Sequence, residues 1–216
     1  MKFKVDLKIL IFLIVFYFTN QLELYILILF FAFLHECSHI ILARILGFNI
    51  KRIELMPFGF FCELKPNIED FNKKVLNSNM VEFKKIFIAI AGPLSNIAII
   101  FAILLLHRIY SLDRLNIMVY SNILICIFNF IPIFPLDGGR ILKSVLKIVY
   151  GNKKANQYID SFSRYMVILL TISSSFLIVY LENILILFVL GYLWYLVIVE
   201  HKNYVMKKML YEVFDE

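Results

Sequence analysis

Residues 33–42 of the chain read FLHECSHIIL, with two histidines and a glutamate inside a run of aliphatic and aromatic side chains. His35 and His39 are four positions apart, so on a helix they lie on one face, one turn from each other. Glu36 is rotated by about 100° around the axis and stands beside them. In this H-E-x-x-H pattern both imidazoles bind zinc and the glutamate is the general base. The alternative is a pair of polar side chains hydrogen-bonded across a helix bundle.

The composition of the chain is that of a membrane protein. Of its 216 residues, 62% are hydrophobic and 18% are charged, a balance outside the range of ordinary soluble domains. We therefore expect an all-α polytopic membrane protein with six transmembrane helices. The predicted spans are residues 7–18, 24–46, 86–106, 117–133, 166–181 and 184–199. An ionisable side chain near the bilayer centre costs on the order of 3 kcal/mol, which makes His35, Glu36 and His39 candidates for function.

Lysine and arginine are distributed unequally between the two sides of the predicted spans. With the N-terminus in the cytoplasm, 19 of the 22 basic residues fall in cytoplasmic loops and tails, two fall outside, and Arg44 lies within the second span. This asymmetry fits the positive-inside rule only if both termini are cytoplasmic and the number of spans is even. The net charge of +6 is therefore explained by the basic residues of the cytoplasmic loops and tails. It gives no reason to propose nucleic acid as a partner.

A catalytic zinc site needs three protein ligands and an open position for water. The predicted spans hold no third histidine, and Cys37 lies about 200° around the helix from His35. Asp137 is the best remaining candidate, at the end of the fourth span in the stretch NFIPIFPLDGGR, residues 129–140. The prolines and glycines there predict irregular backbone, which is tolerated at membrane depth where it lines a polar cavity. The alternative role for Asp137 is that of a helix cap at the interface.

The segment after the second span is predicted to form a short membrane-associated β-hairpin. Residues 52–55 alternate between polar and apolar side chains, and Pro57, Phe58 and Gly59 favour a turn. An extended peptide could add to the edge of the hairpin as a further strand, which makes Pro57, Phe58 and Gly59 candidate substrate-binding residues. The alternative is an ordinary interfacial loop.

Four stretches in order resemble the site-2 protease family of intramembrane zinc metalloproteases, most closely its stage IV sporulation factor B branch. They are HECSH at 35–39, IKRIELMPFGF at 50–60, AGPLSN at 91–96 and NFIPIFPLDGGR at 129–140. The resemblance implies a Zn²⁺ ion held by His35, His39 and Asp137, with Glu36 as the catalytic base. It also implies that Asn129 holds the substrate backbone, for which a helix–helix hydrogen bond is the alternative.

The resemblance also implies a substrate and a location. The expected activity is cleavage of a membrane-associated precursor near the cytoplasmic face, the precursor being the pro-form of a late sporulation sigma factor. The resemblance further implies membrane-bound inhibitory partners. It also implies a location in the cell membrane or the mother-cell forespore membrane of a bacterium. A membrane-spanning anti-sigma factor is the alternative substrate. We expect a membrane-embedded metalloprotease domain over residues 1–200 and a short cytoplasmic tail over 201–216, without the CBS domain usual in this branch.

Two other classes of protein also place polar residues in membrane spans. A metal transporter would use histidine and aspartate, but its ligands would follow a path through both leaflets, and the outer half of these spans offers no such series. A non-catalytic membrane scaffold would not need Glu36, which zinc binding alone does not require. The protease is therefore the leading prediction.

Overall fold

A computed structural model describes residues 2–57, 59–66, 78–110, 114–181 and 185–215 of the chain. The described residues are mainly helical, as predicted. The chain divides into two compact units, Met1–Phe130 and Ile131–Glu216.

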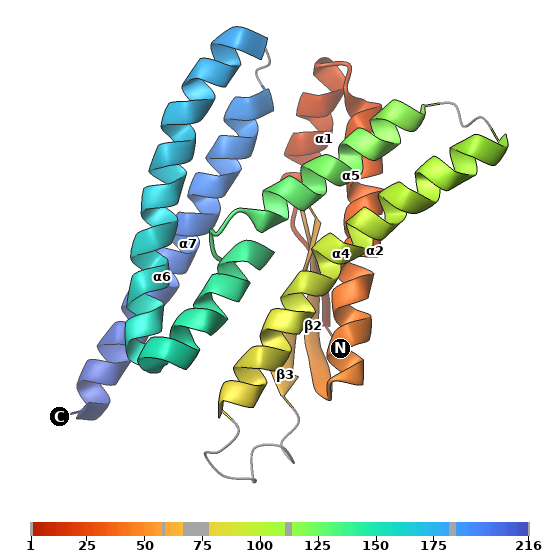
Figure 1. Ribbon diagram of the computed structural model, residues 1–216. Coiled ribbons are helices and arrows are strands. Elements are labelled where there is room, and N and C mark those ends of the chain that lie inside the picture. Colours follow the sequence, from red (N-terminus) through yellow and green to blue (C-terminus); the bar gives the residue numbers. More distant parts are fainter. Residues whose placement is uncertain (1, 58, 67–77, 111–113, 182–184, 216) are drawn as a thin grey trace. The chain divides into compact units, whose positions relative to one another are not determined.

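The described part of the first unit contains four helices and a three-stranded sheet (Figure 1). The helices are α1 (Lys8–Phe18), α2 (Leu22–Ile45), α4 (Ser78–Tyr110) and α5 (Leu115–Phe130). The strands are β1 (Lys2–Val5), β2 (Phe48–Met56) and β3 (Gly59–Pro66). The predicted first and second spans match α1 and α2 closely, whereas α4 extends beyond the predicted third span at both ends.

Three helices in the described residues are long and apolar enough to cross a bilayer, namely Leu22–Ile45, Asn79–Tyr110 and Leu185–Met206. The apolar helices α1 and α5 have 11 and 16 residues, fewer than the roughly 20 that an untilted span requires. Large apolar side chains are exposed along these helices, as expected where lipid is the solvent. A membrane protein is supported, and the number of six spans stays a prediction.

The packing of α2 against α4 and α5 forms the apolar core of the first unit. Ile28 and Phe31 of α2 pack with Ile103 of α4 and Ile125 of α5 in one buried cluster. Near the other end of α2, Ala43 packs with Ile88 of α4 in a second cluster. The early part of α4 therefore meets the late part of α2, and the two helices run antiparallel.

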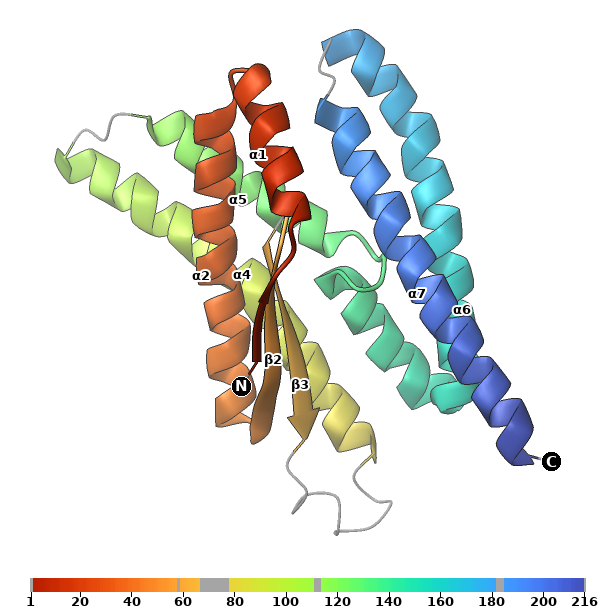
Figure 2. The ribbon, with the colours of Figure 1, turned by 180° about the vertical axis from the view of Figure 1, so that it is seen from behind.

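The sheet confirms the predicted hairpin and adds one strand that was not predicted. β2 and β3 pair antiparallel from Phe48↔Pro66 to Met56↔Gly59. β1 pairs in parallel with β2 from Lys2↔Arg52 to Val5↔Leu55, so the four residues before the predicted first span form a strand that the sequence pattern did not indicate. The strand order β1-β2-β3 leaves the outer edge of β3 without a strand partner among the described residues (Figure 2).

The hairpin runs back along α2 and is anchored there by a buried tyrosine. The Tyr25 hydroxyl donates a hydrogen bond to the Pro57 carbonyl oxygen at 2.9 Å, and the Phe16 ring stacks on the Tyr25 ring at 4.6 Å. Tyr25 precedes His35 by ten residues, which is about 15 Å along a helix. Both hairpin strands contact α2, so the hairpin passes alongside the helix that carries the histidine pair.

The second unit is built from two long helices, α6 (Asp137–Leu181) and α7 (Leu185–Asp215), which lie side by side (Figure 2). Gly151 interrupts α6 with a φ of 76° and a ψ of 172°. α7 continues without a break through the residues predicted to form a short tail.

Polar contacts join α6 to α7 at two levels. The Trp194 indole donates a hydrogen bond to the Thr171 hydroxyl at 3.0 Å. Further along, the buried Asp160 carboxylate lies 2.9 Å from His201 Nδ1 on α7 and 3.1 Å from Arg164 on its own helix. The first of these contacts connects the predicted fifth and sixth spans, and the second lies beyond their cytoplasmic ends as predicted.

The hydrogen bond from Tyr25 to the Pro57 carbonyl is expected to stabilise the protein, and removal of the tyrosine hydroxyl tests this. Tyr25→Phe is expected to lower the free energy of unfolding by about 1 kcal/mol, because it leaves a buried carbonyl without its donor. Thermal unfolding of the purified protein in detergent measures the change. Tyr17→Phe is the control, because Tyr17 is 64% exposed, and equal stability losses in the two variants would contradict the prediction.

Candidate metal centre

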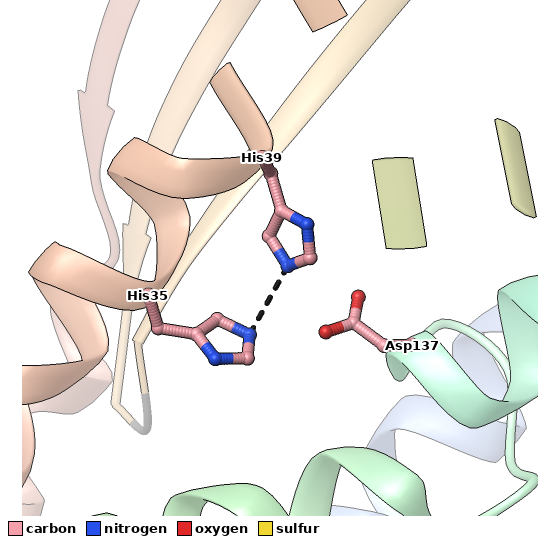
Figure 3. A group of neighbouring side chains, drawn as sticks. All are labelled: His35, His39 and Asp137. Carbon is pink, nitrogen blue, oxygen red and sulfur yellow. Dashed lines mark hydrogen bonds between the residues drawn. The ribbon is translucent and has the colours of Figure 1, made fainter. Parts of the chain in front are cut away.

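His35 and His39 face each other from successive turns of α2, as their spacing predicts. Their Nε2 atoms lie 3.1 Å apart, and each residue is 1% exposed (Figure 3). Two imidazole nitrogens bound to one tetrahedral zinc at ordinary bond lengths are about 3.3 Å apart. The pair of nitrogens is therefore already spaced for a shared metal ion.

A hydrogen bond from α2 to α4 determines which nitrogen of His39 is available to a metal. His39 Nδ1 lies 2.6 Å from the carbonyl oxygen of Ile88. A carbonyl oxygen can only accept, so Nδ1 carries the proton and donates. The lone pair of the neutral ring is then on Nε2, the atom that faces His35, and backbone carbonyls commonly orient metal-binding histidines in this way.

Gly92 allows α4 to approach the histidine pair closely. A Cβ atom placed on Gly92 would lie 2.3 Å from His39 Nε2 and 2.4 Å from His35 Nε2. Both distances are too short for any side chain at this position. The absence of a side chain therefore allows the backbone of α4 to pack directly against both imidazole rings.

Glu36 follows His35 directly on α2 and is half-buried. Its position beside the pair, turned by about 100° around the axis, is the one that the sequence pattern predicts. Its role as general base stays a prediction.

Asp137 is the first residue of α6, in the second unit, and its side chain is buried (Figure 3). The preceding loop folds closely over this first turn, because a Cβ atom on Gly139 would lie 2.3 Å from backbone atoms of Ile133 and Phe134. Arg140 Nη1 lies 3.6 Å from Asp137 Oδ1. In the DGG sequence, Asp137 therefore supplies a carboxylate at the start of α6. Gly139, which has no side chain, leaves room for the backbone of the preceding loop. The role of Asp137 as third ligand stays a prediction.

The residues predicted to bind substrate fall in two places in the first unit. Asn129 lies in the last turn of α5, where its amide nitrogen donates to the Ile125 carbonyl at 3.1 Å. Pro57 is buried and accepts the Tyr25 hydrogen bond, and Gly59 begins β3. Phe58 lies outside the described residues. Their contacts with substrate stay predictions.

Sequence reasoning missed two contributors to the site. Gly92 was recognised only as part of the stretch AGPLSN, and Ile88 carried no chemical signal because it acts through its backbone carbonyl. A glycine beside a proline in an apolar span was the one available sign of close helix approach. Neither contribution could be located without the pairing of α4 with α2.

Comparison with known proteins places these features in a family. The model of peptidase family M50 matches residues 23–113 and 106–173. The stage IV sporulation protein FB of Bacillus subtilis is 29% identical over 126 residues, which cover 57% of this chain and 40% of that protein. A zinc metalloprotease of Methanocaldococcus jannaschii is 30% identical over 145 residues, which cover 62% of this chain and 37% of that protein. The chain thus matches about two fifths of the length of these curated relatives.

The fold has a counterpart among solved structures. The site-2 protease from Methanocaldococcus jannaschii superposes with a TM-score of 0.70 at 23% identity, covering 93% of this chain and 91% of that chain. At this level of identity the comparison supports a common fold. It confirms the site-2 protease architecture that the four sequence motifs predicted.

The close approach at Gly92 predicts that a single methyl group will disturb the metal site. Gly92→Ala is expected to lower zinc affinity by roughly 10–100-fold, because the added carbon would overlap both Nε2 atoms. Zinc content of the purified protein after dialysis against a chelator buffer measures the effect. Gly191→Ala is the matched control on α7, where an added Cβ would meet no atom within 4 Å, and equal zinc loss in both variants would refute the prediction.

Proposed function

Because the chain belongs to peptidase family M50, we propose that it is an intramembrane zinc metalloprotease of the site-2 type. The observation that carries this proposal is the pair of buried Nε2 atoms, 3.1 Å apart, on a helix long enough to cross a bilayer. Ionisable side chains inside an apolar span are rare, and they mark functional sites by default.

The proposed metal ligands are His35, His39 and Asp137, the set of two histidines and one carboxylate that leaves a catalytic zinc one open position. Zinc bound there would supply a Lewis acid for the scissile carbonyl and the attacking water. Glu36 takes the proton from the attacking water onto its carboxylate. It then delivers that proton to the nitrogen of the departing amine.

The free edge of β3 is the proposed docking site for the substrate backbone. β1 already occupies one edge of β2, and the outer edge of β3 has no strand partner among the described residues. An extended peptide there would gain main-chain hydrogen bonds. The turn at Pro57, Phe58 and Gly59, and the Asn129 side chain, are the proposed further contacts.

The proposed substrate is a membrane-associated precursor cleaved near the cytoplasmic face. Similarity to the stage IV sporulation protein FB favours the pro-form of a late sporulation sigma factor, and a membrane-spanning anti-sigma factor is the second candidate. The proposed topology has six spans and both termini in the cytoplasm, in the cell membrane or the mother-cell forespore membrane. Membrane-bound inhibitory proteins are the proposed partners.

Removal of the general base tests the mechanism. Glu36→Gln is expected to slow cleavage of the co-expressed sigma-factor precursor by roughly 10²–10⁴-fold, the usual contribution of a positioned base, while zinc content is retained. Immunoblotting of precursor and product measures the rate. Glu23→Gln, in the first turn of the same helix, is the control and should cleave normally. Cleavage that persists in Glu36→Gln would exclude the proposed mechanism.

Removal of the carboxylate ligand tests the metal assignment. Asp137→Asn is expected to reduce zinc affinity and cleavage together, because a neutral amide is a much poorer zinc ligand than a carboxylate. Metal analysis of the purified variant gives the zinc stoichiometry. If Asp137→Asn binds zinc with the full stoichiometry and the affinity of the parent chain, Asp137 is not a zinc ligand. A separate assay of the parent chain in vesicles tests the transporter alternative, which zinc uptake would favour.

A further inference from the structure

Asn96 on α4 is a fully buried amide with an unusual environment. Its exposed fraction is 0%, and neither Oδ1 nor Nδ2 has a hydrogen-bond partner among the described residues. Buried polar groups in native proteins are almost always hydrogen-bonded, so an exception requires an explanation. A ligand that binds during function would supply the missing hydrogen-bond partner.

The position of Asn96 follows from the antiparallel packing of α2 and α4. The Ile88 carbonyl meets His39, and Gly92 faces both histidine Nε2 atoms. Asn96 is one turn beyond Gly92, about 6 Å along the axis and turned by about 40°. It therefore lies on the same face of α4 as Gly92, toward the His35 end of the pair.

The direction of helical side chains brings the Asn96 amide back toward the metal centre. Side chains on a helix point toward its N-terminus, so Asn96 covers the turn that precedes its own Cα. That turn contains Gly92, which has no side chain to occupy the space. Helix geometry therefore directs the Asn96 amide toward the turn that faces the two Nε2 atoms.

We propose that the Asn96 side-chain N–H donates a hydrogen bond to the carbonyl oxygen of the scissile peptide. This inference rests on the proposed protease function. When water attacks the carbonyl carbon, a C–O bond forms and the C=O π pair moves onto the oxygen, while Glu36 takes the proton from water. Asn96 stabilises the negative oxygen without losing its own proton. The C–N bond then breaks as the amine takes the proton from Glu36.

Two other asparagines of the first unit show why Asn96 is distinctive. Asn122 is also fully buried, but its amide nitrogen donates to the Met118 carbonyl at 3.0 Å. The amide nitrogen of Asn129 likewise donates to a carbonyl of its own helix. Of the three, only Asn96 keeps its N–H groups uncommitted, as a donor to a developing oxyanion must.

The test compares Asn96→Leu and Asn96→Asp with the parent chain and with Asn122→Leu, which removes an equally buried amide. The enzymes are reconstituted with the sigma-factor precursor in phosphatidylethanolamine and phosphatidylglycerol vesicles. Both Asn96 variants are expected to lower kcat by roughly 10²–10³-fold, as loss of an oxyanion donor does. We expect KM to change by less than about threefold, with zinc content unchanged. Asn96→Leu should unfold at the same or a higher temperature, because it removes an unpaired buried amide.

Each outcome separates this inference from the function on which it rests. If the parent chain cleaves, Glu36→Gln does not, and Asn96→Leu keeps the parent kcat, the inference fails while the proposed function stands. Equal loss of kcat in Asn122→Leu, or loss of zinc together with activity in the Asn96 variants, also overturns it in favour of a structural role. If the parent chain, reconstituted in the same vesicles with the sigma-factor precursor and separately with the anti-sigma factor, cleaves neither, the proposed function fails and the inference fails with it.

Discussion

The hydrogen bond from His39 Nδ1 to the Ile88 carbonyl joins α2 to α4 at the depth of the histidine pair. It sets the protonation of the imidazole and the alignment of the two helices at once. Association of helices in a bilayer depends on close packing and interhelical hydrogen bonds, because lipid is as apolar as the side chains. Gly92 and Ala43 supply the small surfaces that allow such packing here. The geometry of the metal centre is therefore a consequence of how these two helices meet.

Some buried polar side chains of the first unit make hydrogen bonds, whereas Asn96 does not within the described residues. Tyr25 is buried and bonded, and it holds the hairpin along α2. Ser121 and Asn122 are buried and donate to carbonyls of their own helix. Asn96 is buried with neither amide atom bonded within the described residues. Since an unpaired polar group in a bilayer is costly, its presence one turn from Gly92 supports the proposed role as a hydrogen-bond donor to the substrate.

In the second unit, a tightly folded loop precedes Asp137, the candidate third metal ligand. Gly139 allows the backbone of Ile133 and Phe134 to lie against the first turn of α6, and the Phe134 amide donates to the Ser163 hydroxyl at 3.2 Å. Lys143 lies over the Phe134 ring, 3.8 Å from its centroid. These contacts restrain the loop just before Asp137. A carboxylate on a restrained helix start suits a metal ligand, because its direction is set before the metal binds.

Much of the site was predictable from the chain because it depends on local spacing. A separation of four residues places His35 and His39 on one helical face whatever the surroundings, and alternation with turn residues was enough to predict the β2–β3 hairpin. β1 was missed because four residues carry too short a pattern and its pairing with β2 spans some fifty positions. The tautomer of His39, the closeness of Gly92 and the unpaired amide of Asn96 were decided only by the tertiary structure. Each depends on α4 packing against α2, an arrangement that no local sequence pattern encodes.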